Sequence, residues 1–121
     1  MNELKDRILK AIKDAKEKLD ITLIYKDWGN KRQKCACPLG CVLLVNDHGL
    51  YFDSEQNTAE AAHVLGVSED WVYNFICGFD GDTQNENESV EFLKEAWELG
   101  YSIRKEVDAI DYSNFLDRIV D

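Results

Sequence analysis

A mainly α-helical fold is predicted by three features of the 121-residue sequence. Apolar residues recur at helical spacing in the N-terminal segment, and capping or turn residues follow at helix-length intervals. The chain contains only one proline, so few positions break a helix. Because this length suits one domain, we expect residues 1–121 to form a compact orthogonal bundle of five or six helices that contains a helical hairpin.

The first helix is predicted over residues 3–19. Its apolar positions fall on one helical face: Leu4, Ile8, Ala11, Ile12, Ala15 and Leu19. Charged residues lie between them, and pairs such as Glu3 and Arg7 have the i,i+4 spacing that supports a helix. The following segment, 21–34, is ambiguous, because "ITLIY" has strand propensity whereas "WGN" indicates a turn.

Capping residues predict the remaining helices. Pro38 suits the first position of a helix that runs through residue 45 and ends near "NDHG", and "LYF" at 50–52 is typical of a short extended piece. The sequence "NTAE" at 57–60 matches a capping box, and Gly66 ends that helix. Ser68 is expected to cap the next helix. Two further helices are predicted over 89–107 and 112–120.

The stretch "TAEAAHVLGVSEDWVYNFI", residues 58–76, resembles the helix-turn-helix unit of excisionase and MerR-type proteins. Ala62, Gly66, Val72 and Phe75 occupy the packing positions of that pattern. Those positions make two helices cross and read no bases, so the resemblance implies a helix-turn-helix-like hairpin that serves as scaffold. More broadly, "CPLG", "LGVSEDWVYNFICGFDG" and "WELGYSIR" are similar to small uncharacterised proteins of bacterial and phage genomes. This implies a shared fold and transfers no catalytic residue.

The net charge of −10 is unevenly distributed. Residues 1–34 hold ten Lys/Arg and six Asp/Glu, hence +4, whereas residues 46–100 hold one lysine and thirteen acids, hence −12. An acidic surface repels phosphates and attracts basic proteins, so duplex DNA is not an expected partner of the hairpin. No apolar run spans a bilayer and no signal-peptide block is present, so we expect a cytoplasmic protein with no membrane contact.

The leading hypothesis is a non-catalytic, acidic interaction or regulatory module that binds a protein partner. No serine–histidine–acid set, phosphate loop or histidine-rich motif is present, and we expect neither catalysis nor a cofactor. Aromatic side chains flanked by acids suit a basic partner. The candidate surface is the exposed ring around five residues: Asp70, Tyr73, Asn74, Asp80 and Asp82.

The four cysteines support an alternative, a small zinc-binding or thiol-redox domain. Cys35, Cys37 and Cys41 lie within seven residues, and Cys77 is a possible fourth ligand. Four thiolates can hold zinc, although this spacing departs from the paired C-x₂₋₄-C pattern. If Cys37 caps the helix that opens at Pro38, the helix dipole lowers its thiol pKa and favours redox chemistry.

An acidic stretch and a basic region each have some features of a binding site. Residues 80–91 have the length and some of the acids of a calcium loop, but Asn85 replaces the turn glycine, so we expect no calcium site. Nucleic-acid binding, the third hypothesis, requires the basic N-terminal region. Its only patch surrounds Trp28 and consists of Lys26, Lys31, Arg32 and Lys34.

Overall fold

The computed structural model describes residues 2–82 and 91–119. Within these ranges the chain forms six helices and four short strands. In chain order they are α1 (Asn2–Leu19), β1 (Thr22–Tyr25), β2 (Gly29–Asn30), β3 (Cys35–Ala36), α2 (Pro38–Val45), α3 (Ser54–Leu65), α4 (Glu69–Asp80), α5 (Glu91–Glu106), β4 (Ile110–Asp111) and α6 (Tyr112–Ile119). The predicted helical majority is confirmed. Most of residues 80–91, where no calcium site is expected, lies outside the described residues.

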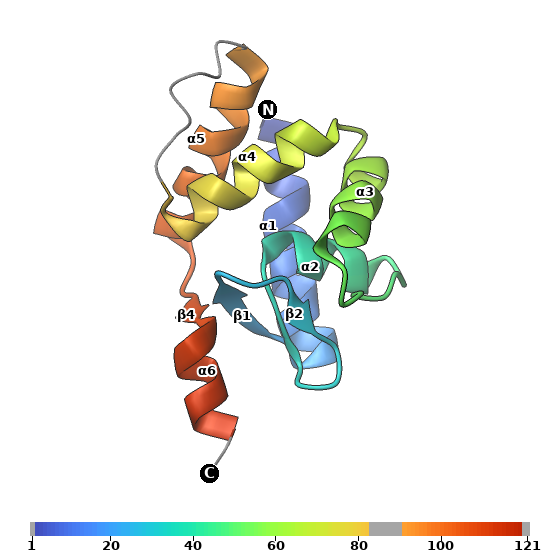
Figure 1. Cartoon of the computed structure of the whole chain (residues 1–121), viewed down its shortest axis with the longest axis vertical. Helices are drawn as coiled ribbons and strands as arrows, with labels where there is room; N and C mark the ends of the chain where they lie inside the picture. Colours follow the sequence, from blue (N-terminus) through green and yellow to red (C-terminus); the bar gives the residue numbers. More distant parts are fainter. Residues whose placement is uncertain (1, 83–90, 120–121) are drawn as a thin grey trace.

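The main core lies where α1, α2, α4 and α5 meet. Ile8 of α1, Leu39 and Leu43 of α2 and Phe75 of α4 are completely buried in one cluster. Figure 1 shows α4 between α5 on one side and α3 on the other, with the end of α6 far from the start of α1 along the long axis. Every residue of α2 from Pro38 to Leu44 is buried, which explains why its sequence is apolar on all sides.

The structure contains a small sheet that was not predicted from the sequence, and its strand order is β2-β3-β1-β4. β1 pairs in parallel with both β3 and β4, and β2 pairs antiparallel with β3. Three of these strands are only two residues long, too short for any alternating pattern. The sheet matters for function because it fixes the loop that follows β1.

The start of α3 differs from the prediction. Asp53 caps this helix by accepting a hydrogen bond from the Glu55 amide at 2.9 Å, so the helix begins at Ser54 and not at the predicted capping box. Asn57 is instead a buried residue inside the helix. The predicted end at Gly66 is correct, and so is the cap of α4, where the Ser68 hydroxyl accepts from the Trp71 amide at 3.0 Å.

Two glycines let α4 and α5 pack backbone against backbone. A Cβ at Gly78 would lie 2.0 Å from the Trp97 carbonyl oxygen, and one at Gly100 would lie 2.1 Å from that of Phe75. Arg104 joins α5 to the end of α4 by donating to the Phe79 carbonyl at 2.9 Å. This contact holds the C-terminal half of α4 in place, where it forms one wall of the groove described below.

None of the helices in the described ranges has the length and apolar character that crossing a membrane requires.

Candidate functional site

A groove surrounds Trp28 on one face of the molecule. It consists of two adjoining hollows that share Asp27, Trp28 and Ser54. The first, which we call the α4 pocket, has a volume of about 240 Å³. The second, the loop pocket, has a volume of about 330 Å³. Together they form one continuous candidate binding surface on this face.

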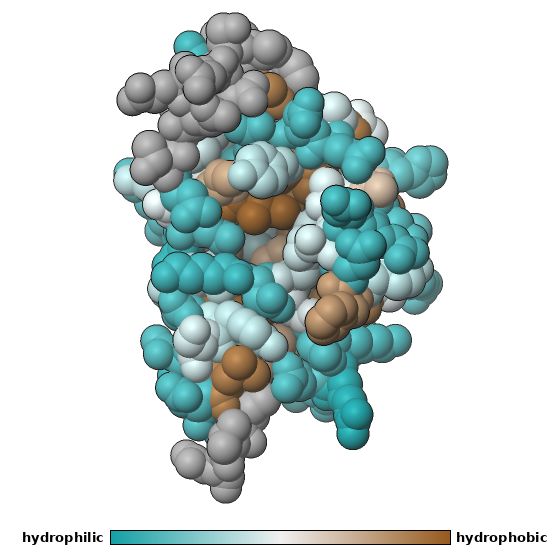
Figure 2. Space-filling view, in the orientation of Figure 1, coloured by the Kyte–Doolittle hydropathy of each residue, from teal (hydrophilic) through white to brown (hydrophobic). Residues whose placement is uncertain are grey.

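The α4 pocket has an apolar lining and a charged margin. Its apolar and aromatic residues come from the β1–β2 turn, α2 and α4: Trp28, Pro38, Leu39, Phe75, Ile76 and Phe79. Its other lining residues are Lys26, Asp27, Cys37, Ser54 and Asp80. Figure 2 shows this character as hydrophobic atoms at the floor of a hollow in the middle of the face, with hydrophilic residues around it.

Local backbone interactions build the pocket. Lys26 follows β1 with a left-handed φ of 73°, which turns the chain towards Trp28, and its amide donates to the Asp80 carboxylate at 3.0 Å. The Trp28 carbonyl accepts from the Cys37 amide at 3.0 Å, at the point where α2 begins. The turn, the start of α2 and the end of α4 are therefore tied together around one hollow.

The loop pocket is bordered by an exposed aromatic residue on a fixed loop. The Asn57 side chain receives a hydrogen bond from the Tyr51 amide at 2.8 Å and donates one to the Tyr51 carbonyl at 2.9 Å. The next residue, Phe52, is fully exposed. Asn57 thus holds the loop through the backbone of Tyr51, while Phe52 projects into solvent.

Among the described residues, the carboxylates at the margin form no ion pair, whereas the nearby lysine and arginine contact other groups. Within the described ranges, no ion pair involves Asp27 or Asp80. The Lys26 ammonium lies 3.1 Å from Asp111, and the Arg104 guanidinium lies 3.5 Å from the centre of the Tyr25 ring. The α4 pocket therefore has a net negative margin.

Asp80 occupies a position that disfavours its charge. Burial raises the pKa of its carboxyl group, and the nearby Asp82 adds to the effect, against the hydrogen bond from Lys26 and the charge of Arg104. Asp80 is also the last residue of α4, where the helix dipole disfavours an acid. A buried carboxyl group with a raised pKa in a pocket is a candidate for contact with a ligand.

Of the five residues of the predicted surface, Asp80 is the one that lines the groove. Asp70, Tyr73 and Asp82 are exposed and do not line it. The expected exposure of Asn74 is wrong: its side chain is buried and donates to the Asp70 carbonyl at 2.8 Å, one turn earlier in the same helix. Sequence spacing did not reveal this, because Asn74 lies on the α4 face that also buries Trp71 and Phe75.

The predicted activation of Cys37 is also wrong. Cys37 does cap α2, its sulfur accepting from the Gly40 amide at 3.4 Å. However, burial outweighs this interaction and raises the pKa of the Cys37 thiol to about 12. Burial raises the pKa of the Cys41 thiol as well. Both thiols are therefore protonated at neutral pH.

The structure does not bring together the ligands of the alternative zinc site. Cys35, Cys37 and Cys41 are buried and Cys77 is half-buried, all four as free thiols. In the part of the chain that the structure describes, no three cysteine, histidine or acidic side chains converge as a metal site would require.

We predict that Cys77 is the thiol that reacts first in the folded protein. Cys77 is half-buried, whereas Cys35 and Cys41 have no exposed surface and Cys37 is only 5% exposed in the lining of the α4 pocket. Burial raises the pKa of all four thiols, so the expected difference in reactivity follows from access of the reagent to the sulfur. Iodoacetamide at neutral pH should label Cys77, and the other thiols only after denaturation, as read by peptide mass spectrometry. The Cys77→Ser variant should remain unlabelled when folded. Labelling of Cys37 before Cys77 would contradict the burial argument.

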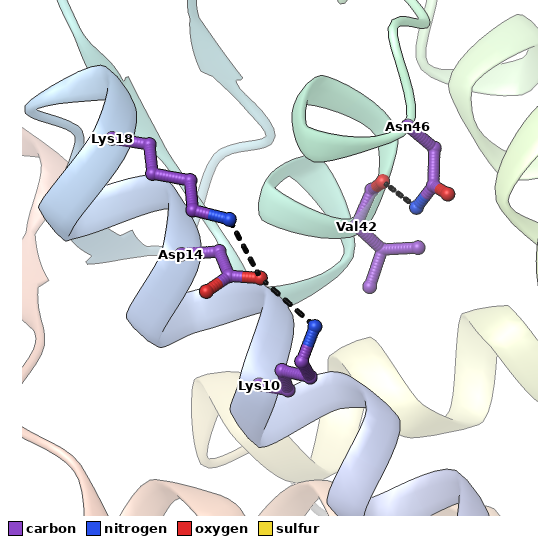
Figure 3. Close-up of polar contacts among 5 residues, drawn as sticks. All are labelled: Lys10, Asp14, Lys18, Val42 and Asn46. Carbon is purple, nitrogen blue, oxygen red and sulfur yellow. Dashed lines mark hydrogen bonds and ion pairs between the residues drawn. The ribbon is translucent and has the colours of Figure 1, made fainter.

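A polar hollow between α1 and α2 is a weaker candidate, because its charged groups bind one another. Lys10 and Lys18 lie 3.3 and 3.9 Å from the Asp14 carboxylate, and the Asn46 amide donates to the Val42 carbonyl at 2.7 Å (Figure 3). The Arg7 guanidinium, which also lines this hollow, donates to a backbone carbonyl of α3.

The predicted basic patch is partly neutralised. Lys26 pairs with Asp111, and Lys34 lies 3.9 Å from Asp20. Lys31 and Arg32 are exposed in the turn between β2 and β3. Two exposed cations next to an acidic pocket form a poor surface for a polyanion.

Most of the groove could not be predicted from the sequence. The sequence places Trp28 in a turn and at the centre of the basic patch, and it places Phe52 in a short extended piece. One available signal was Asp53, a good helix cap, since a cap there leaves Phe52 in the preceding loop. The meeting of Trp28 with α4, by contrast, depends on contacts distant in sequence.

Comparison with known proteins adds no functional information: no family model, curated protein or solved structure matches the chain.

Proposed function

We propose that this protein is a non-catalytic interaction module whose groove binds a basic segment of a protein partner. The observation that carries the proposal is the combination of apolar hollows, unpaired carboxylates and an exposed aromatic side chain on one face. Aromatic anchors surrounded by polar residues are typical of protein interfaces. The two adjoining hollows suit an extended segment better than a compact ligand.

The fixed position of Phe52 supports this function. A solvent-exposed phenylalanine costs free energy in water, and here it lies on a loop that Asn57 holds with two backbone hydrogen bonds. A preordered anchor loses little conformational entropy on binding, which favours affinity. Phe52 is therefore suited to be a central contact of the complex.

Charge favours a basic partner over a second copy of this chain. The chain carries a net charge of −10, and Asp27 and Asp80 lie at the groove itself. Two copies meeting through this face would bring their unpaired acids together, which is unfavourable. A segment with lysine or arginine residues neutralises them and associates faster at low ionic strength.

We also infer that α3 and α4 form a helix-turn-helix-like hairpin that serves as scaffold and does not enter a DNA groove. Glu69 and Asp70 are exposed in the first turn of α4, where they would face phosphates. Asn74, the residue best suited to read a base, uses its amide within its own helix. These features support a role for α4 as a wall of the groove.

The proposal is tested by selecting binders from an unbiased random peptide library displayed on mRNA, at physiological salt. The recovered peptides should be rich in lysine or arginine next to aromatic or aliphatic residues. Their binding, measured by fluorescence anisotropy, should weaken as salt increases. Recovery of acidic peptides, or of no peptide above the matrix background, would contradict the proposal.

Phe52→Ser is predicted to weaken binding of the selected peptides by about tenfold, the loss of a hot-spot contact of ~1.4 kcal/mol. Folding should be unaffected, because the side chain contributes no buried surface. Leu19→Ser is the matched control, since it removes an exposed apolar side chain from the end of α1. Anisotropy titrations should separate the two variants. Equal affinities would place the contact elsewhere.

A further inference from the structure

We propose that the α4 pocket is a receptor for one arginine side chain of the basic partner, with Asp80 as its specificity-determining residue. This inference rests on the proposed function and deepens it by assigning a ligand chemistry to one hollow. The assignment follows from the pocket's lining, its unpaired charges and the hydrogen-bonding capacity of Asp80.

The lining suits a cation on an apolar stem. Trp28 supplies partly exposed aromatic surface, the lining also includes the almost fully buried Phe75 and Phe79, and the hollow of about 240 Å³ has room for a single long side chain. Cations interact favourably with aromatic rings, and the methylene groups of such a stem pack against apolar walls. A lining of this kind, closed at the margin by carboxylates, differs from a purely hydrophobic pocket.

Asp80 has an oxygen available for a ligand. Its Oδ1 accepts from the Lys26 amide at 3.0 Å, and across the described residues no hydrogen bond to Oδ2 is present. Asp27, the second carboxylate of the pocket, accepts from the Gly29 amide through one oxygen. Two acids therefore retain acceptor capacity at a hollow whose own cations are occupied elsewhere.

Arginine fits this arrangement better than lysine does. A guanidinium group is planar, weakly hydrated and able to stack on an aromatic ring while it donates to a carboxylate. Lysine carries a compact, strongly hydrated charge that loses more on entering an apolar pocket. The mixture of aromatic walls and carboxylates thus selects the guanidinium.

The unfavourable setting of Asp80 supports the same assignment. Burial and the C-terminal end of α4 both oppose its negative charge. Because the pKa of Asp80 is raised in the folded protein, the charged form costs stability as the pH rises through that pKa. Asp80→Asn removes this cost and can keep the hydrogen bond from Lys26, so at pH 7 the variant should melt no lower than the natural protein.

The test uses three tripeptides of the form acetyl-Gly-Xaa-Gly-amide, with arginine, lysine or citrulline as Xaa. Titration into ¹⁵N-labelled protein should shift the amide signals of Trp28 and Ile76 with the arginine peptide, more weakly with lysine, and not with neutral citrulline. Asp80→Asn should raise the dissociation constant of the arginine peptide by about tenfold. Asp82→Asn is the matched control: it removes an exposed acid two residues away that does not line the pocket, and it should have little effect.

Equal shifts with arginine and citrulline, or equal affinities of Asp80→Asn and Asp82→Asn, would overturn the assignment. A lysine peptide that binds as tightly as the arginine peptide would overturn the choice of guanidinium. The proposed function has a separate outcome, because selected peptides that depend on Phe52 but not on Asp80 would leave it standing while this inference fails.

Discussion

Alanine at Gly78 is expected to destabilise the fold by about 3 kcal/mol. In an ordinary helix interior this change would stabilise, because alanine has the higher helix propensity. Here the new Cβ would lie 2.0 Å from the Trp97 carbonyl oxygen, so α4 and α5 would have to separate. Because the clash is with a backbone atom, no change of side-chain rotamer can relieve it. Gly100→Ala should be similarly costly, since its Cβ meets the Phe75 carbonyl at 2.1 Å.

Urea denaturation of both variants provides the measurement, with Gly49→Ala as control. Gly49 has no atom within 4 Å of the position a Cβ would take, so its substitution should change the free energy of unfolding by less than about 1 kcal/mol. A Gly78→Ala variant as stable as Gly49→Ala would mean that the two helices do not pack as described.

Asn57→Asp is expected to cost about 3 kcal/mol at neutral pH. The carboxylate would face the Tyr51 carbonyl, an acceptor, in place of the amide that now donates to it at 2.9 Å. Asn57 is almost fully buried, so water cannot compensate. The loop that carries Phe52 would lose its support, and affinity for basic peptides should fall with it.

The effect should depend on pH with a defined sign. Because a protonated carboxyl group can donate to the Tyr51 carbonyl, the folded state favours protonation, and the stability deficit should shrink as the pH falls. Urea unfolding at pH 7 and pH 4 measures this. Asn46→Asp is the control, because Asn46 is exposed and makes a single hydrogen bond to its own helix. A loss of stability from Asn57→Asp that is no larger than that from Asn46→Asp would contradict the role of the two hydrogen bonds between Asn57 and Tyr51.

The helices could be predicted from the sequence because their signals are local. The apolar stripe of α1, Pro38 at the start of α2, and the caps at Gly66 and Ser68 each depend on neighbouring residues. The sheet could not, because β2, β3 and β4 gain stability only through pairing with distant segments. The start of α3 was misplaced because Asp53 and the sequence at 57–60 both match a cap, and tertiary packing buries Asn57.

The candidate site was less accessible than the fold. The net negative charge follows from composition, and Asp80, one of the residues of the predicted surface, lies in the lining of the groove. The groove itself depends on contacts between Trp28, α2 and α4, which lie tens of residues apart in sequence. Burial also determines the pKa of the Cys37 thiol. Desolvation raises this pKa, whereas the helix dipole, which the sequence suggests, would lower it.

Binding of a basic segment in the groove is tested by titrating a selected peptide into ¹⁵N-labelled protein and mapping the amide signals that shift. We expect the shifted signals to belong to the groove, in particular those of Trp28, Phe52, Ser54, Ile76 and Asp80. Signals that move instead along α1, or in the exposed turn at Lys31 and Arg32, would contradict it.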